Sequence, residues 1–260
     1  MTLQNRSELV GAKRVVVKVG SSSISGANVG NIDLLVSAIS KARTNGSEVV
    51  LVTSGAIATA MPLLNLESKP EDLPTSQALA AVGQGRLISR YQASLDRFDI
   101  IGAQVLLTSA DLEGDETSEN ARKAIDRLLE LGILPIINEN DTVATHEIRF
   151  GDNDKLASLI ASLVSADALV LLSDTDALYD KPPTKPGAQR IDVVLFGDDL
   201  ASIEVGDTST GYGTGGAKTK VAAAQLATAA GIAVLLTSTE NVSKALSGQE
   251  VGTWFMPNAE

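Results

Sequence analysis

The sequence predicts an α/β protein, a three-layer αβα sandwich with a mainly parallel central sheet. Of its 260 residues, 44% are hydrophobic but only 3% are aromatic, so the core consists mainly of Ala, Val, Leu and Ile. Short apolar runs with little polar alternation recur along the chain, as expected for strands buried on both faces. Amphipathic stretches of helix length separate these runs, which is the order of a parallel sheet covered by helices on both faces.

The predicted strands and helices alternate from the first apolar run to the last. The predicted strands span residues 14–19, 48–53, 100–107, 133–138, 168–173 and 232–237. The predicted helices span residues 32–44, 77–95, 118–131, 155–165 and 217–230. Two segments interrupt this order: residues 143–150 are a candidate β-hairpin, and the Pro- and Gly-rich residues 180–189 predict a surface loop. We expect a single domain of residues 1–260, with a division near Ala166 into lobes 1–165 and 166–260.

The composition excludes several classes of function. There are 21 Lys and Arg against 32 Asp and Glu, a net charge of −11, and no stretch concentrates the basic residues. Nucleic acid is therefore not an expected partner. The absence of cysteine excludes disulfides, thiolate metal sites and cysteine nucleophiles. The sequence contains no signal-peptide core and no apolar run of about 18 residues, so we expect a cytoplasmic protein without membrane contact.

Polar residues and glycines follow four of the predicted strands. Because ligands of parallel α/β sheets bind beyond the carboxyl ends of the strands, we expect these groups to converge on one site. They are residues 18–23, residues 53–56, residues 138–141 with 151–155, and residues 173–176.

Lys18 lies in an otherwise apolar run, VVVKVG. A buried lysine is costly unless it is paired, so we expect its ammonium group to face an anion. The alternative is a lysine on an edge strand whose ammonium group reaches the solvent. Gly20 and the serines after it supply backbone amides that suit phosphate oxygens.

The segment 211–220, GYGTGGAKTK, is rich in glycine and opens a predicted helix. Such a turn exposes backbone amides at the positive end of a helix, which suits phosphate binding. A polar stretch precedes it instead of a strand, so it is not a dinucleotide fingerprint, and Ala217 breaks the Walker pattern. We interpret it as a different nucleotide-phosphate loop, with Lys220 reaching the transferred group; a flexible surface loop is the alternative.

Two clusters of Asn and Asp flank the candidate hairpin. Their amides and carboxylates suit the amino and carboxylate groups of an amino acid, or Mg²⁺. Ordinary turn formation is the alternative interpretation. The sole histidine, His146, lies between the clusters, and we assign it no role in catalysis. The clusters comprise Asn138, Asn140, Asp141, Asn153 and Asp154.

Segments across nearly the whole chain resemble the glutamate 5-kinase (gamma-glutamyl kinase) family of the amino acid kinase superfamily. The INEND, GDND and GTGG segments point to the glutamate branch, whereas the KxG start is shared more widely. The matching segments are VVVKVGSS, VVLVTSGAIA, QALAAVGQGRLI, AQVLLTSAD, NARKAI, LPIINENDTVAT, FGDNDKLASLIA, LVLLSDTDALY and GYGTGGAKTK.

The resemblance implies that ATP phosphorylates the γ-carboxylate of L-glutamate, with Mg²⁺ as the accompanying ion. The product would be L-glutamyl 5-phosphate, which opens proline biosynthesis. The resemblance assigns residues 1–165 to glutamate and residues 166–260 to ATP. It also implies that proline is a feedback inhibitor and that the protein is a homo-oligomer, a dimer or a tetramer.

The resemblance also gives roles to individual residues. Lys18 and Lys220 would hold the moving phosphoryl group, and Asp154 would orient these lysines or help to place Mg²⁺. The expected glutamate-binding residues are Ser54, Asp141 and Asn153. The expected ATP contacts, besides Lys18, are Ser173, Asp174, Thr214, Gly215, Gly216, Ala217, Lys218, Thr219 and Lys220. The ligands of the metal stay open.

The sequence departs from this family in two respects. Many members continue into a C-terminal PUA domain, which we do not expect here because the sequence stops at Glu260, and Ser173 stands where many relatives have threonine. Two other functions stay open at this point. One is another amino acid kinase acting on aspartate, N-acetylglutamate, carbamate or UMP, because these share the fold. The other is a non-catalytic regulator that binds a nucleotide or an amino acid.

Overall fold

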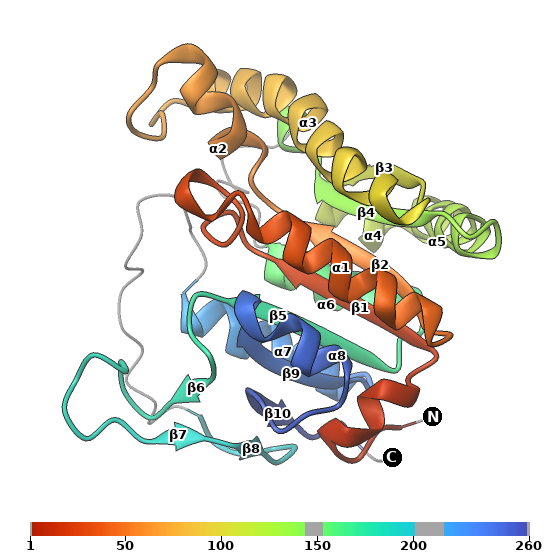
Figure 1. Ribbon diagram of the computed structural model, residues 1–260, viewed down its shortest axis with the longest axis vertical. Coiled ribbons are helices and arrows are strands. Elements are labelled where there is room, and N and C mark those ends of the chain that lie inside the picture. The colour runs from red at the N-terminus through yellow and green to blue at the C-terminus, as the bar shows by residue number, and fades with distance from the viewer. Residues whose placement is uncertain (1, 144–152, 201–215, 259–260) are drawn as a thin grey trace.

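A computed structural model describes residues 2–143, 153–200 and 216–258 of the chain (Figure 1). Its centre is an eight-stranded sheet in the order β3-β4-β2-β1-β5-β9-β10-β8, and a second sheet pairs β6 with β7. The strands are β1 (Arg14–Val19), β2 (Glu48–Thr53), β3 (Gly102–Leu107), β4 (Leu134–Glu139), β5 (Ala168–Ser173), β6 (Leu178–Tyr179), β7 (Arg190–Ile191), β8 (Val193–Val194), β9 (Ala233–Ser238) and β10 (Thr253–Phe255).

The sheet is parallel from β3 to β9, and β10 runs antiparallel to β9. This confirms the prediction of a mainly parallel sheet. All six predicted strands are present, with ends within two residues of the predicted ones. The sequence prediction missed β6, β7, β8 and β10, because strands of two or three residues are too short to show a pattern.

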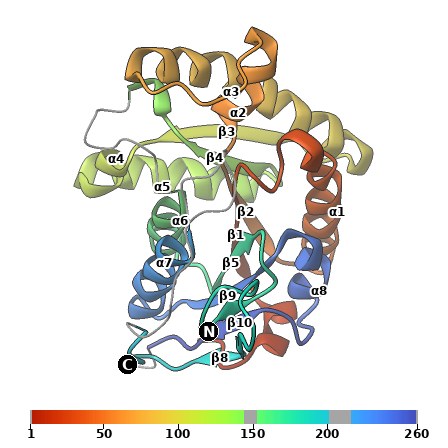
Figure 2. The same cartoon turned by 90° about the vertical axis from the view of Figure 1, so that its left-hand side faces the viewer.

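Helices cover both faces of the sheet (Figure 2). Side chains of α1, α3 and α8 join one core cluster, and those of α5, α6 and α7 join the other. The α-helices are α1 (Asn31–Thr44), α2 (Ala56–Ala60), α3 (Leu73–Leu95), α4 (Ser109–Glu113), α5 (Asp115–Glu130), α6 (Asn153–Leu163), α7 (Ala217–Ala229) and α8 (Val242–Leu246). The 3-10 helices are η1 (Arg6–Gly11), η2 (Gly26–Asn28), η3 (Met61–Leu64), η4 (Asp96–Phe98), η5 (Asp141–Val143) and η7 (Thr239–Asn241).

Alternation along β1 decides which helices each of its side chains meets. Val15 and Val17 belong to the cluster with α1, whereas Val16 belongs to the cluster with α6 and α7. Because successive side chains of a strand point to opposite faces, Lys18 shares the face of Val16. The sheet therefore directs this buried lysine towards α6 and α7.

Local capping signals explain where α3 begins. The Asp72 carboxylate accepts a hydrogen bond from Thr75 N at 2.9 Å, and proline occupies position 74 in the first turn. Acidic N-caps and early prolines are favoured at helix starts. The sequence prediction began this helix four residues late, at residue 77, because it followed the apolar period and not these signals.

The two irregular segments have different outcomes. Residues 180–189 form an exposed loop between β6 and β7, as predicted, and Asp180 N donates to Gln189 O at 3.0 Å to close it. The candidate hairpin lies outside the described residues except for Val143, which ends η5. The division of the chain into two lobes near Ala166 stays a prediction. Among the described residues, no helix has the length and apolar character to cross a membrane.

Candidate active site

A buried cluster of two lysines and one aspartate lies at the carboxyl end of β1. Lys18 Nζ lies 2.6 Å from Asp154 Oδ1, and Lys220 Nζ lies 3.1 Å from Asp154 Oδ2. All three side chains are buried. Thr219 Oγ1 also donates to Asp154 Oδ2, at 2.9 Å. The expected anion beside Lys18 is therefore this carboxylate, supplied from another part of the chain.

The charges of the cluster favour a further anion. Burial raises the pKa of Asp154, but the charges of Lys18 and Lys220 and their hydrogen bonds outweigh it and hold the pKa well below its ordinary value. Asp154 is therefore ionised and lies between two buried ammonium groups. A phosphoryl group placed beside both ammonium groups would be stabilised electrostatically.

Three elements bring this cluster together. Lys18 lies one residue before the end of β1, Asp154 is the second residue of α6, and Lys220 is in the first turn of α7. The two helices pack side by side, and Ser158 Oγ of α6 donates to Ala223 O of α7 at 2.7 Å. The sheet and the helix pair therefore place residues more than 60 positions apart in the sequence within hydrogen-bonding distance.

Asn153, the first residue of α6, is held by the ends of two strands. Its Nδ2 donates to Thr53 O at 2.7 Å and to Asn138 Oδ1 at 2.8 Å. Thr53 ends β2, and its Oγ1 lies 2.8 Å from the Tyr91 hydroxyl of α3. Both N–H groups of the Asn153 amide are therefore engaged, and its Oδ1 accepts no hydrogen bond from the described residues.

The other two expected glutamate-binding residues lie close to these strand ends. Ser54 follows β2 and is half-buried, and its N–H donates to Val19 O at 3.2 Å. Asp141 opens η5, just beyond β4. Burial raises the pKa of Asp141 to about 6, and the positive charge of Lys69 opposes this shift. Desolvation lowers the pKa of the half-buried Lys69, and Asp141 raises it.

The expected nucleotide contacts surround the same strand ends. The hydroxyls of Ser22 and Ser23 both donate to Asp174 Oδ1 at 3.0 Å, which joins the loop after β1 to the loop after β5. Ser173 ends β5, and its Oγ lies 3.4 Å from Thr175 Oγ1.

The described part of the glycine-rich loop leads directly into α7. Gly216 is the N-cap of α7, Ala217 is half-buried, and Lys218 is exposed. Thr219 lies one residue before Lys220, and its hydroxyl also contacts Gly216 O, at 3.0 Å. Thr214 and Gly215 lie outside the described residues. The helix start thus lies beside the Lys220 ammonium group, as the phosphate-loop interpretation requires.

The described residues offer Mg²⁺ no ready-made protein cage. Among them, no group of three His, Asp or Glu side chains could hold a metal ion. The Asp154 carboxylate is engaged by two ammonium groups. This donor set fits an ion that is held mainly by the phosphates of a nucleotide, as Mg²⁺ often is.

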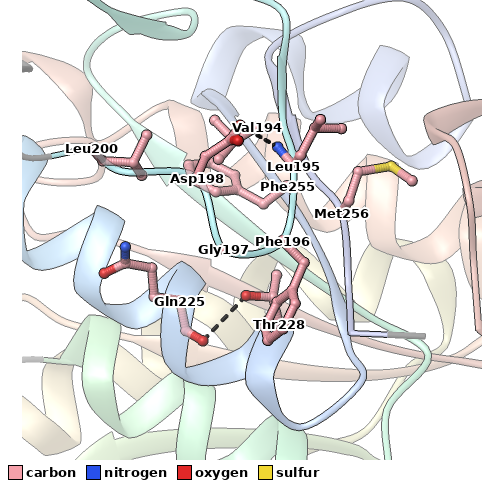
Figure 3. A pocket seen from close by; sticks show the side chains of 10 residues that line it. All are labelled: Val194, Leu195, Phe196, Gly197, Asp198, Leu200, Gln225, Thr228, Phe255 and Met256. Atoms are coloured by element: carbon pink, nitrogen blue, oxygen red, sulfur yellow. Dashed lines mark hydrogen bonds between the residues drawn. The ribbon is translucent and has the colours of Figure 1, made fainter. Parts of the chain in front are cut away.

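An apolar pocket of about 200 Å³ lies elsewhere, between α7 and the segment after β8 (Figure 3). Asp198 is the one charged residue among the ten described residues that line it, and its carboxylate accepts from Leu195 N at 2.7 Å. Gln225 and Thr228 line it from the second half of α7, away from Lys220 at the helix start. The pocket is therefore separate from the lysine–aspartate cluster.

The sequence interpretation assigned no role to three polar residues near the site: Gln84, Tyr91 and Lys69. Gln84 and Tyr91 lie on the buried face of α3 among leucines and alanines. A polar side chain on such a face needs an internal partner, and this signal points to both residues. Lys69 lies in a loop, where no periodicity marks it.

Known proteins resemble this chain over most or all of its length. The model of the amino acid kinase family matches residues 13–238. Glutamate 5-kinase of Clavibacter sepedonicus is 61% identical over 259 residues, covering 100% of both chains. Glutamate 5-kinase of Thermobifida fusca (strain YX) is 51% identical over 98% of this chain and 67% of its own length.

Solved structures share the fold at low sequence identity. Carbamate kinase from Giardia lamblia, bound to AMP-PNP, superposes with a TM-score of 0.67 at 19% identity, covering 96% of this chain and 100% of that one. A structure of isopentenyl phosphate kinase gives a TM-score of 0.64 at 17% identity, covering 93% of this chain and 99% of that one. The family match over residues 13–238 and the glutamate 5-kinase relatives together show that this chain belongs to the amino acid kinase family.

Proposed function

We propose that this protein transfers the γ-phosphoryl group of ATP to the γ-carboxylate of L-glutamate and so forms L-glutamyl 5-phosphate. The buried Lys18–Asp154–Lys220 cluster carries this proposal, because it holds two ammonium groups on a carboxylate that directly follows Asn153 in the chain. The 61% identity to a glutamate 5-kinase over the whole chain supports the choice of substrate.

Charge stabilisation is the main task of the cluster. A γ-carboxylate oxygen of glutamate forms a bond to the γ-phosphorus, and the bond to the β,γ-bridging oxygen breaks, so that ADP leaves with the negative charge. Lys18 and Lys220 stabilise the charge on the transferred oxygens, and Asp154 keeps the two ammonium groups in place. The attacking carboxylate is already ionised at neutral pH, so no general base is needed.

Hydrogen-bond polarity explains how Asn153 distinguishes the groups of the acceptor. Both of its N–H groups are used within the protein, so only Oδ1 remains, and Oδ1 can only accept. Of the polar groups of glutamate, the carboxylates cannot donate and the α-ammonium group can. Asn153 therefore binds the ammonium group, together with the Asp141 carboxylate, and this leaves the γ-carboxylate free for the reaction.

The ATP phosphates lie at the start of α7 and beside the loop after β1. Gly216 to Thr219 supply amides at the positive end of a 13-residue helix. Asp174 accepts hydrogen bonds from Ser22 and Ser23, and these bonds fix the loop after β1 against the loop after β5 on the nucleotide side of the site. Mg²⁺, held mainly by the ATP phosphates, would neutralise part of their charge.

The alternative kinases differ from the proposed one in the acceptor that they phosphorylate, and the alternative binding protein differs in having no turnover. Aspartate, N-acetylglutamate, carbamate and UMP kinases share the fold, so the fold cannot separate them. A binding protein without turnover has no need of two buried lysines on one carboxylate. The product also implies a role in proline biosynthesis, and glutamate-saturation curves with and without proline test the expected feedback inhibition.

One assay separates these functions. The protein is incubated with ATP, Mg²⁺ and hydroxylamine, together with glutamate, aspartate or N-acetylglutamate, and acyl phosphate is trapped as the hydroxamate. We expect hydroxamate and ADP from glutamate only. Product from another acid instead would overturn the substrate. ADP release with none of these acids, nor with carbamate or UMP, would favour a binding protein.

A further inference from the structure

Gln84 of α3 has three hydrogen-bond partners, two at the end of β4 and one on β3. Its Nε2 donates to Glu139 O at 3.1 Å, and its Oε1 accepts from Asn138 Nδ2 at 3.2 Å and from Gln104 Nε2 at 3.1 Å. Gln84, Asn138 and Glu139 are buried. Asn138 in turn accepts from the Asn153 amide at 2.8 Å. A continuous chain of hydrogen bonds therefore runs from α3 to Asn153.

Backbone atoms determine the orientation of the side-chain amides of Gln84, Asn138 and Asn153. Thr53 O and Glu139 O can only accept, so Asn153 and Gln84 must turn their nitrogens to them. Glu139 N can only donate, and it donates to Asn138 Oδ1 at 2.9 Å. The Asn138 nitrogen is thereby directed to Gln84 Oε1. None of these three side-chain amides can flip without breaking a hydrogen bond to the backbone.

We propose that Gln84 is a positioning residue of the acceptor site, which holds the end of β4 so that Asn153 and Asp141 keep their ligand-binding positions. Its bond to Asn138 acts on Asn153, and its bond to Glu139 O acts on the backbone two residues before Asp141. This inference rests on the proposed function, because it takes Asn153 and Asp141 as the ammonium-binding pair.

Close packing explains why α3 can serve as the support. A Cβ at Gly83 would lie 1.8 Å from Ala56 O, so α3 touches the backbone of α2, the helix that follows Ser54. Loss of the Gln84 amide leaves Glu139 O and Asn138 Nδ2 without this partner in a buried place. Because unsatisfied buried polar groups are costly, Asn138 would rotate towards other partners and release Asn153.

Gln92 on the same helix provides a matched control. Its Nε2 donates to Asp96 Oδ1 at 2.6 Å and to Ile100 O at 3.1 Å, and its Oε1 accepts from Gly102 N at 2.9 Å. Like Gln84, it makes three hydrogen bonds through its side-chain amide, one of them from Nε2 to a backbone oxygen. These bonds lie at the start of β3 and not at the end of β4. Replacing either glutamine by methionine removes comparable bonds and keeps an unbranched side chain.

The test compares Gln84→Met with Gln92→Met in steady-state kinetics and thermal unfolding. We expect Gln84→Met to raise the KM for glutamate about ten-fold or more, with little change in the KM for ATP. Gln92→Met should lower the thermal midpoint to a similar degree and leave the KM for glutamate near that of the wild type. Equal effects of the two variants on the KM for glutamate would overturn the positioning role.

Gln84→Glu is the conservative variant and covers the case in which Gln84→Met fails to fold. While its carboxyl is protonated it can still donate to Glu139 O, and once ionised it repels that oxygen. We therefore expect its KM for glutamate, relative to wild type at the same pH, to rise as pH increases between about 6 and 9. A ratio that stays at one throughout this range contradicts the proposal.

Different results would contradict the proposed function and the positioning role of Gln84. If wild-type protein phosphorylates another acid and not glutamate, the proposed function is wrong, and the same variants are then compared on that acid. If wild-type protein phosphorylates glutamate and Gln84→Met behaves as Gln92→Met does, the positioning role alone is wrong.

Discussion

Lys18 and Asp154 form a buried ion pair whose Nζ and Oδ1 atoms lie 2.6 Å apart, although 136 positions separate the two residues in the sequence. The second oxygen of the same carboxylate binds Lys220. A single carboxylate thus holds two ammonium groups in a fixed arrangement before any ligand binds. Preorganised charges of this kind lower a barrier without rearranging during the reaction.

Lys220→Met should slow turnover far more than it weakens glutamate binding. Because Lys220 stabilises charge that develops during transfer, we expect kcat to fall by about 10²- to 10³-fold with little change in the KM for glutamate. Steady-state hydroxamate assays measure both constants. Lys244→Met, on α8 at the opposite face of the sheet, serves as the control and should retain wild-type kcat. A Lys220→Met variant with wild-type kcat would exclude the role in transfer.

Asp154→Asn should destabilise the protein as well as inactivate it. The change leaves two buried ammonium groups without their shared carboxylate, so we expect the free energy of unfolding to fall by about 3–5 kcal/mol. The pKa of Asp154 is held below its ordinary value of 3.8, so its contribution is fully present above that value and is lost as pH falls through the folded-state pKa.

Urea unfolding of wild type and Asp154→Asn at several pH values measures this difference. It should be constant from about pH 5 to 8. Glu119→Gln is the comparison, because its partners Arg122 and Lys123 lie on the exposed side of α5. Its effect on stability should be much smaller. Equal effects from both variants would contradict the picture of a buried, mutually dependent cluster.

Glutamate binding should weaken in mild acid. Burial raises the pKa of Asp141 from 3.8 to about 6, so the carboxylate that binds the ammonium group becomes neutral as pH falls through that value. We expect kcat/KM for glutamate to show an acidic limb near pH 6. Because the charge of Lys69 lowers the pKa of Asp141, Lys69→Met should move this limb to higher pH.

The controls for the pH profile are Lys41→Met and Asp141→Asn. Lys41 is exposed in α1, so its replacement should leave the limb in place. Asp141→Asn should abolish the limb and lower kcat/KM across the whole range. A limb that keeps its position in Lys69→Met would show that the two charges do not interact in solution.

Two glycines of α3 should respond in opposite ways to alanine. At Gly83 a Cβ would lie 1.8 Å from Ala56 O, a backbone atom, whereas at Gly85 nothing lies within 4 Å of the added Cβ. Gly83→Ala should therefore destabilise the protein by about 1–3 kcal/mol and raise the KM for glutamate, because α2 and Ser54 shift. Gly85→Ala should stabilise the helix by up to about 1 kcal/mol.

Denaturant titration of both glycine variants measures these changes. The two substitutions share the same helix and the same chemistry, so helix propensity alone predicts the same sign for both. A stabilised Gly83→Ala variant would show that the α2–α3 contact is looser than the structure describes.

The sequence alone was sufficient for the architecture and for the edge of the sheet that carries the site. Strands buried on both faces leave apolar runs that can be recognised locally, so β1, β2 and β5 were predicted with their exact ends. Because ligands bind beyond the carboxyl ends of parallel strands, these strand ends then identified Lys18 and Asn138 as candidate site residues. The start of α7 added Lys220.

Only the tertiary structure decided which of these groups touch and in what orientation. Nothing in the local pattern pairs Lys18 with Asp154, or turns the Asn153 nitrogen to Thr53 O across 100 positions of sequence. Gln84 is one of several polar residues of α3, and its bond to Asn138 of β4 depends on how α3 packs against the sheet. Periodicity records burial along a segment, whereas ion pairs and amide orientations depend on distances between segments, which only the packed chain sets.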